Sequence, residues 1–200
     1  QNTMKAIFYS LILFCCLGCR AEKEWTLTSP DGAVRFVATQ VPEGEETTIL
    51  QYSVYCGDSL VINPSRLGLV MDGIEYGKDA RPAGKAVVKT MNEPYELKAG
   101  KQLRTVNACR EMTIPFEGFQ LIVRAYDDGI AFRYAFTQED DGKQHTITDE
   151  LTEFSVPANG KAWIHPYDWN ERHKPSYEQY SKNGIAINTE ASHGRGWAFP

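Results

Sequence analysis

Short runs in which apolar and polar residues alternate recur along the chain, and this feature constrains the fold most strongly. The clearest runs lie at residues 119–125 and 130–136, where every second residue is apolar. A period of two places those residues on one face of a β-strand. Runs at 34–38 and 50–56 have the same period, and Cys56 falls on the apolar face of the second. No long window keeps a helical period, so the sequence predicts an all-β protein.

Turn-forming residues separate these runs at short intervals. Asp127-Asp128-Gly129 lies between the two clearest runs, and we expect a tight hairpin in which Gly129 takes the positive-φ position. Further turn sequences are Pro30-Asp31-Gly32, Pro42-Glu43-Gly44, Cys56-Gly57-Asp58, Met71-Asp72-Gly73, Asp141-Gly142 and Ala158-Asn159-Gly160. This spacing is typical of an antiparallel sandwich. The length of 200 residues allows one domain or two small ones.

Charge and cysteine content exclude some classes of protein. The formal net charge is −5 and no basic cluster occurs, which argues against a nucleic-acid partner. Beyond the first 20 residues only Cys56 and Cys109 remain, without the spacing of a zinc site. Two arrangements stay open for this pair: a disulfide, as in oxidising compartments, or two separate buried thiols.

Residues 1–20 have the pattern of an export signal. Their uncharged apolar stretch, 6–18, is short for a membrane span and fits the core of a secretory signal. It ends in Leu17-Gly18-Cys19, which resembles a bacterial lipobox, although Cys16 stands where a lipobox usually has Leu. We therefore expect a signal peptide or lipoprotein signal, lipidation at Cys19, and a periplasmic or outer-membrane-anchored bacterial protein. Simple export and a retained anchor are the alternatives.

Near residue 157 the alternation stops and polar aromatic side chains dominate. The aromatic and imidazole side chains of residues 157–180 include Trp163, His165, Tyr167, Trp169, His173, Tyr177 and Tyr180. Such a surface suits contact with a ligand or another domain, whereas an irregular segment capping the sandwich would have a similar composition. The apolar, strand-like residues 194–200 predict that this sequence is the front part of a longer chain.

The acidic residues do not single out a catalytic pair. Glycosidic hydrolysis usually needs two carboxyl groups flanking one bond, and 26 Asp and Glu residues offer many pairs. Asp127, Asp128 and Asp141 precede turn glycines and are typical turn formers. The histidines are too scattered for a metal pair, and no phosphate loop, serine-nucleophile elbow or EF-hand calcium loop is present. The residues alone therefore indicate a binding or scaffold domain.

Several blocks, in order along the chain, resemble the N-terminal domain of glycoside hydrolase family 97. They are 29–32 (SPDG), 64–69 (PSRLGL), 92–97 (NEPYEL), 100–101 (GK), 106–107 (VN), 123–134 (VRAYDDGIAFRY), 177–180 (YEQY) and 196–200 (GWAFP). The block at 123–134 is the most specific. The resemblance covers about residues 25–200.

The resemblance implies a fold, an enzyme class and a metal. Family members are exported bacterial α-glucosidases or α-galactosidases. An N-terminal β-super-sandwich, of the galactose-mutarotase type, precedes a (β/α)8 barrel that holds every catalytic residue, and a β domain follows the barrel. Residues 21–200 would be the sandwich, truncated before the barrel and inactive alone. The family's calcium ion takes barrel carboxylates and one glutamate of the N-terminal domain, which maps onto Glu178; calcium prefers such oxygen ligands.

The predicted role of the domain is therefore to form a wall of a downstream active site. We expect Trp169 and Tyr177 to contact the carbohydrate substrate beside the calcium ligand Glu178. If Glu178 is not the ligand, Glu171 is the next carboxylate to consider. The alternative function is a stand-alone exported carbohydrate-binding or mutarotase-like sandwich, which would need its own His and Glu as an acid–base pair.

Overall fold

The computed structural model describes residues 23–136, 142–167, 180–191 and 196–198. In these ranges every regular element is a β-strand, so the all-β prediction is confirmed. The described residues contain no helix long and apolar enough to cross a membrane.

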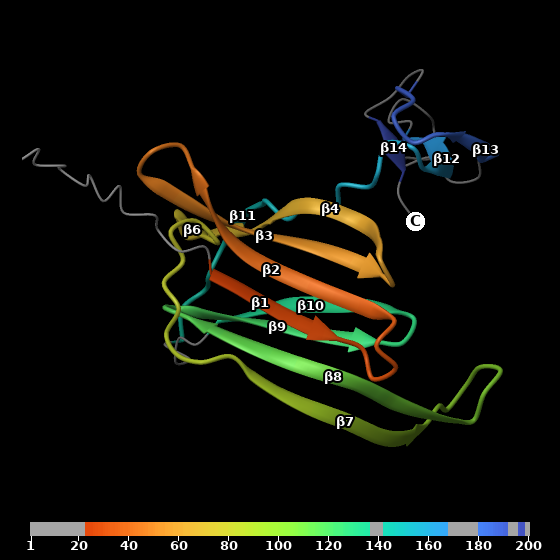
Figure 1. Cartoon of the computed structure of the whole chain (residues 1–200), viewed down its shortest axis with the longest axis horizontal. Coiled ribbons are helices and arrows are strands. Elements are labelled where there is room, and N and C mark those ends of the chain that lie inside the picture. Colours follow the sequence, from red (N-terminus) through yellow and green to blue (C-terminus); the bar gives the residue numbers. More distant parts are fainter. Residues whose placement is uncertain (1–22, 137–141, 168–179, 192–195, 199–200) are drawn as a thin grey trace, which may run out of the picture.

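Two antiparallel four-stranded sheets pack face to face (Figure 1). The first sheet has the order β1-β2-β3-β4, with bounds β1 Lys23–Thr28, β2 Val34–Glu43, β3 Thr47–Cys56 and β4 Ser59–Leu67. The second has the order β10-β9-β8-β7, with bounds β7 Val87–Glu96, β8 Arg104–Phe116, β9 Phe119–Tyr126 and β10 Gly129–Phe136. Strands that follow one another in sequence are neighbours within each sheet, as hairpin connections require.

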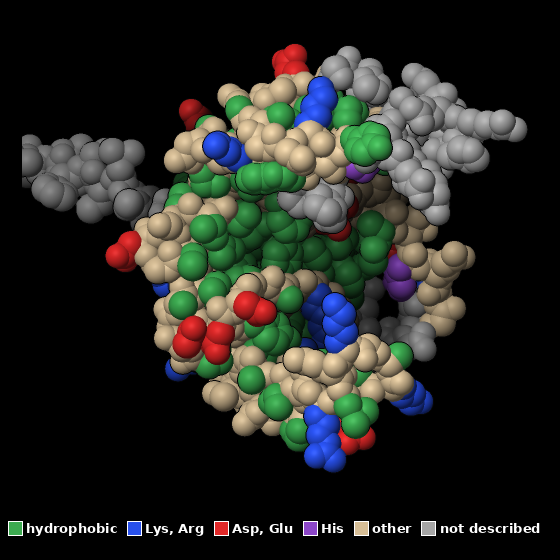
Figure 2. All heavy atoms as spheres, turned by 90° about the vertical axis from the view of Figure 1, so that its right-hand side faces the viewer, with side chains coloured by type: hydrophobic (Ala, Val, Ile, Leu, Met, Phe, Trp, Pro, Cys, Tyr) green, Lys and Arg blue, Asp and Glu red, His purple; other side chains and the backbone are tan. Residues whose placement is uncertain are grey.

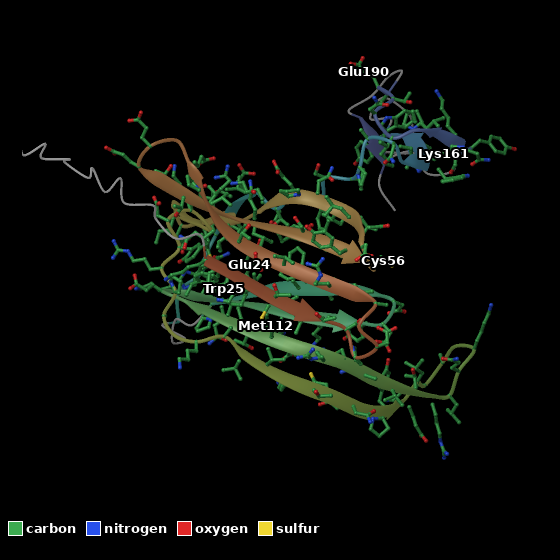
Figure 3. The ribbon with its side chains drawn as sticks, viewed as in Figure 1. Glu24, Trp25, Cys56, Met112, Lys161 and Glu190 are labelled. Atoms are coloured by element: carbon green, nitrogen blue, oxygen red, sulfur yellow. The ribbon has the colours of Figure 1, made fainter. Side chains whose placement is uncertain are left out.

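The core lies between these two sheets and is built from alternate residues, as the sequence predicts. Phe36 on β2 and Leu121 on β9 are both 0% exposed. The ring of Phe36 also faces that of Phe132 on β10, with centroids 6.3 Å apart. Figure 3 shows Trp25 on β1 and Met112 on β8, and both residues belong to this core or pack against it. Removing such side chains from water is the main force that holds two sheets together.

The β9–β10 hairpin forms where predicted, but its glycine has a different role. Asp127 and Asp128 make the turn, and Gly129 already pairs with Tyr126 as the first residue of β10. Gly129 does not have a positive φ, so the prediction for its conformation is wrong. The turn between β5 and β6 does have left-handed backbone: Asp72 and Gly73 have φ of 52° and 78°, as in a type I′ hairpin turn.

The two cysteines are not bonded to each other. Cys109 on β8 is buried, whereas Cys56 is exposed at the end of β3. The prediction that Cys56 shares the buried face of Leu50, Tyr52 and Val54 is therefore wrong at its last position. Cys56 pairs with Ser59 across the turn that closes the β3–β4 hairpin, where the chain is leaving the sheet.

Two three-stranded sheets complete the described structure. One has the order β11-β5-β6, with bounds β11 Ile147–Glu150, β5 Leu69–Met71 and β6 Ile74–Tyr76. The other, which we call the small aromatic sheet, has the order β13-β12-β14, with bounds β12 Lys161–Pro166, β13 Lys182–Ala186 and β14 Trp197–Ala198. Figure 1 shows the small aromatic sheet beyond β4, apart from the sandwich.

Candidate functional site

The small aromatic sheet is the candidate site because the segment with the predicted site residues lies in sequence between two of its strands, β12 and β13. β12 and β13 are antiparallel, with Ile164 opposite Lys182. The chain therefore leaves β12 and returns to β13 at the same end of this strand pair. Trp169, Tyr177, Glu178 and the alternative Glu171 all belong to residues 168–179, which lie outside the described residues.

The described aromatic side chains of this sheet differ in how they are held. Trp197 donates its indole N–H to the Thr189 carbonyl at 2.6 Å, and the Lys182 Nζ lies 5.6 Å from the ring centroid. Trp163 on β12 is 61% exposed, and Tyr180, two residues before β13, is 99% exposed. Both of these large aromatic side chains are thus open to solvent, as is typical of surfaces that stack on ligands.

Pairing with β14 links this sheet to the last of the family-like blocks. His165 lies opposite Ala198, and Pro166 lies opposite Trp197. The Tyr167 amide also donates to the Gly196 carbonyl at 2.8 Å. The block at 196–200 therefore supports the strand from which the segment with Trp169, Tyr177 and Glu178 departs, and Phe199 and Pro200 lie outside the described residues.

The block at 29–32 and the block at 123–134 meet at one end of the sandwich. The Asp31 carboxylate accepts hydrogen bonds from the Ser29 hydroxyl at 2.7 Å and the Ala33 amide at 2.9 Å. These bonds, the first being the stronger influence, lower the pKa of Asp31. The Asp31 amide in turn donates to Asp127 Oδ1 at 3.0 Å, across 96 residues of sequence. Asp127 is therefore a turn former, as predicted, that also joins two distant turns.

A third block, 64–69, is held by residues that sequence reasoning missed. Tyr134 Oη accepts a hydrogen bond from the Gly68 amide at 2.9 Å and lies 2.7 Å from Thr152 Oγ1. Burial raises the pKa of Tyr134 to about 12, so its hydroxyl keeps its proton at neutral pH. The amide of Ser155 donates to Ser65 Oγ, itself 0% exposed. No local pattern in the sequence indicates these contacts, since each joins residues that lie far apart.

The described residues do not build a calcium site. Calcium takes about six to eight oxygen ligands, and no group of three or more His, Cys, Asp or Glu within residues 23–136, 142–167, 180–191 and 196–198 is placed to hold a metal. The predicted ligand Glu178 is outside these ranges, as is the predicted lipidation site Cys19.

The fold defines this chain as an antiparallel β-sandwich domain with an appended aromatic sheet. The family model described as Glycosyl-hydrolase 97 N-terminal matches residues 27–200. The chain therefore belongs to the glycosyl-hydrolase 97 N-terminal family, as the sequence blocks predict.

Similar proteins are much longer than this chain. A retaining alpha-galactosidase of Bacteroides thetaiotaomicron is 27% identical over 186 residues, which cover 87% of this chain and 26% of that protein. The crystal structure of a beta-arabinopyranosidase matches with a TM-score of 0.74 at 24% identity, covering 88% of this chain and 29% of the other. Because its identity is so low, that second match shows the fold alone.

A solved relative contains a carbohydrate ligand. A glycoside hydrolase family 97 enzyme from Pseudoalteromonas sp. strain K8, in complex with panose, matches with a TM-score of 0.59 at 26% identity. The match covers 71% of this chain and 22% of that enzyme, and the same enzyme has also been solved with acarbose. This chain thus spans about a quarter of the length of the relatives it matches.

Proposed function

We propose that this chain is the N-terminal β-super-sandwich of an exported glycoside hydrolase that acts on α-glucosides or α-galactosides. The observation that carries the proposal is the family match over residues 27–200. In this proposal a (β/α)8 barrel follows the domain in the same polypeptide and supplies the catalytic residues. The domain supplies one wall of the active site through the segment framed by the small aromatic sheet.

The names of the relatives support the substrate class. One relative is a retaining alpha-galactosidase, and another is a family 97 enzyme that binds panose. Panose is built of α-linked glucose units, and an alpha-galactosidase acts on an α-linked galactose unit. We therefore propose an α-linked glucose or galactose unit as the substrate. Trp169 and Tyr177 would stack on the sugar, whose C–H face suits an aromatic ring.

Calcium belongs to this proposal as a cofactor shared between two domains. The described residues offer no cluster of ligands, and one glutamate cannot supply the oxygens that calcium requires. Glu178 would complete a site whose other carboxylates lie in the barrel. Such an ion stabilises the docked state of the two domains, because it binds only that state.

The first test measures hydrolysis by the 200-residue chain alone. We expect no turnover of nitrophenyl α-glucoside or α-galactoside, with calcium present, because the catalytic carboxylates are absent. The polypeptide that continues past Pro200 should hydrolyse one of the two. Turnover by the short chain, after removal of contaminating enzymes, would contradict the proposal, as would an inactive long polypeptide.

The second test addresses Glu178 in the long polypeptide. Glu178→Gln removes a charge that calcium prefers and should raise the calcium concentration needed for activity by about 10-fold or more. The calcium-dependent gain in melting temperature should fall with it. Glu171→Gln is the matched control. If Glu171→Gln has these effects and Glu178→Gln does not, the assignment moves to Glu171.

The exposure of Trp163 and Tyr180 favours a second candidate, a stand-alone carbohydrate-binding sandwich. Calorimetric titration of the short chain with galactose and with panose separates the two functions. Binding that Trp163→Ala abolishes would favour the stand-alone function, whereas absence of binding agrees with a domain that needs its barrel.

A further inference from the structure

The hairpin of β7 and β8 extends past the sandwich as an arm, defined here as residues 92–108 (Figure 1). Four large apolar side chains on this arm are open to solvent. Tyr95 is 49% exposed, Leu97 39%, Leu103 65% and Val106 52%. By contrast, the inward-facing apolar residues of the sandwich, such as Phe36 on β2 and Leu121 on β9, are buried. A cluster of exposed apolar side chains on one projection marks a surface that contacts another body.

Four polar side chains of the arm are paired within the domain. Arg104 Nε lies 3.2 Å from Glu96 Oε1. Asn107 donates to Glu93 at 3.2 Å and accepts from the Tyr126 hydroxyl at 3.0 Å. Lys98 and Lys101 are exposed charged residues of the same arm, so the arm presents its open apolar side chains next to two lysines.

A groove of about 530 Å³ lies on the arm, lined by Pro94, Tyr95, Glu96, Arg104, Thr105 and Val106. Figure 2 looks at the end of the molecule toward which the arm projects, and hydrophobic side chains line the hollow between the two sheets there. The small aromatic sheet lies toward the same end in Figure 1. The arm and the candidate site therefore face a common side of the domain.

We infer that the arm is the docking surface for the catalytic domain that follows residue 200 in the longer enzyme. This inference rests on the proposed function. The relatives are about four times as long as this chain, which covers 26% and 27% of two of them. Interfaces between domains of one chain are commonly about 600–1,500 Å², and an arm with apolar side chains on both faces can supply much of such an area.

The edge of β7 argues against a second copy of this chain as the occupant. β7 is the edge strand of its sheet and contains Lys89, Glu93 and Pro94. Charged residues and proline on an edge strand oppose pairing with the edge of another molecule. The side chains of the arm, rather than its backbone edge, are then the binding surface.

Thiol labelling of the long polypeptide tests the inference. In a Cys56→Ser background, Val106→Cys and Leu103→Cys report on the arm. Ile74→Cys is the matched control, because Ile74 on β6 is 54% exposed, close to the 52% of Val106. Rates of reaction with a water-soluble maleimide are corrected for the parent's own cysteines and normalised to rates in denaturant. We expect the arm cysteines to react at least tenfold more slowly than the control.

Each other outcome contradicts the docking surface, the proposed function or both. Equal rates at Val106→Cys and Ile74→Cys overturn the docking surface, and protection that disappears on dilution assigns it to a second copy instead. Slow labelling in a long polypeptide without glycosidase activity keeps the docking surface and overturns the proposed function. Glycosidase activity together with fast labelling of the arm keeps the proposed function and overturns the docking surface. A reading frame that stops at residue 200 overturns both.

Discussion

Glu111 shows how one residue acquires a role that its sequence position does not reveal. It is 5% exposed and lies between Lys89 Nζ at 2.8 Å and Arg124 Nε at 2.6 Å, on the neighbouring strands β7 and β9. Burial raises the pKa of Glu111, but the hydrogen bonds and charges of Lys89 and Arg124 together outweigh it and lower the pKa. The carboxylate is thus a bridge across three strands.

Replacing this carboxylate should weaken the second sheet. Glu111→Gln keeps the shape but leaves two cations beside a neutral amide, so we expect a loss of about 1–3 kcal/mol of unfolding free energy at neutral pH. The native pKa lies below the unfolded value of about 4.3. The stabilisation is therefore present above that pH and disappears as the pH falls through the native pKa.

Urea unfolding at pH 7 and at pH 3 measures this prediction. The difference between wild type and Glu111→Gln should shrink at pH 3. Glu117→Gln, at an exposed turn position, is the control and should change stability little. An equal loss for both variants would contradict the bridging role.

At the scale of elements, Asp72 fixes the strand β11 to the β5–β6 hairpin. Its Oδ2 lies 2.6 Å from His145 Nδ1, and its Oδ1 accepts a hydrogen bond from the Thr146 amide at 2.9 Å. The backbone bond from Thr146, and then the interaction with His145, lower the pKa of Asp72. A turn former thereby also tethers a strand that lies more than 70 residues along the chain.

Removing this tether should open β11 while leaving the turn intact. Asp72→Gly keeps a residue that accepts positive φ and deletes the carboxylate. Hydrogen exchange of the amides at 146–150 should become faster, with little change in melting temperature. Because the pKa of Asp72 is lowered, wild type should approach the variant only as the pH falls below about 4. Asp58→Gly, in the β3–β4 turn, is the control. If this variant also speeds exchange of the amides at 146–150, the tether is contradicted.

At the scale of the whole molecule, the sandwich stands between two expected attachments. One is the membrane, through Cys19, and the other is the catalytic domain, through the arm and Glu178. Neither attachment involves the buried core, whose apolar residues come from both large sheets and from β5 and β6.

The membrane attachment predicts covalent lipid on the mature protein. Labelled fatty acid should be incorporated into wild type, and Cys19→Ala should abolish incorporation and leave the protein soluble or uncleaved. Stable anchoring usually requires two membrane-binding signals, such as two acyl chains. Membrane fractionation measures this anchoring. Cys56→Ala is the control, since Cys56 lies beyond the signal. Absence of label in wild type would refute lipidation.

Local chemistry let the sequence determine the strands and several of the turns. Alternation at 119–125 predicts a buried face because side chains of a strand point to opposite sides in turn. Asp72-Gly73 forms its turn because both residues tolerate left-handed backbone. The order of the family blocks along the chain likewise indicates the family without reference to any contact between the blocks.

Only the tertiary structure decided which distant residues meet. The bond from Asp31 to Asp127, the burial of Glu111 and the separation of Cys56 from Cys109 depend on how sheets pair and stack. The same local patterns are compatible with other strand orders, and the free energy of burial does not depend on which apolar partner removes a side chain from water. Alternation is therefore written into each strand, whereas the neighbours of each strand are fixed only when the whole core packs at once.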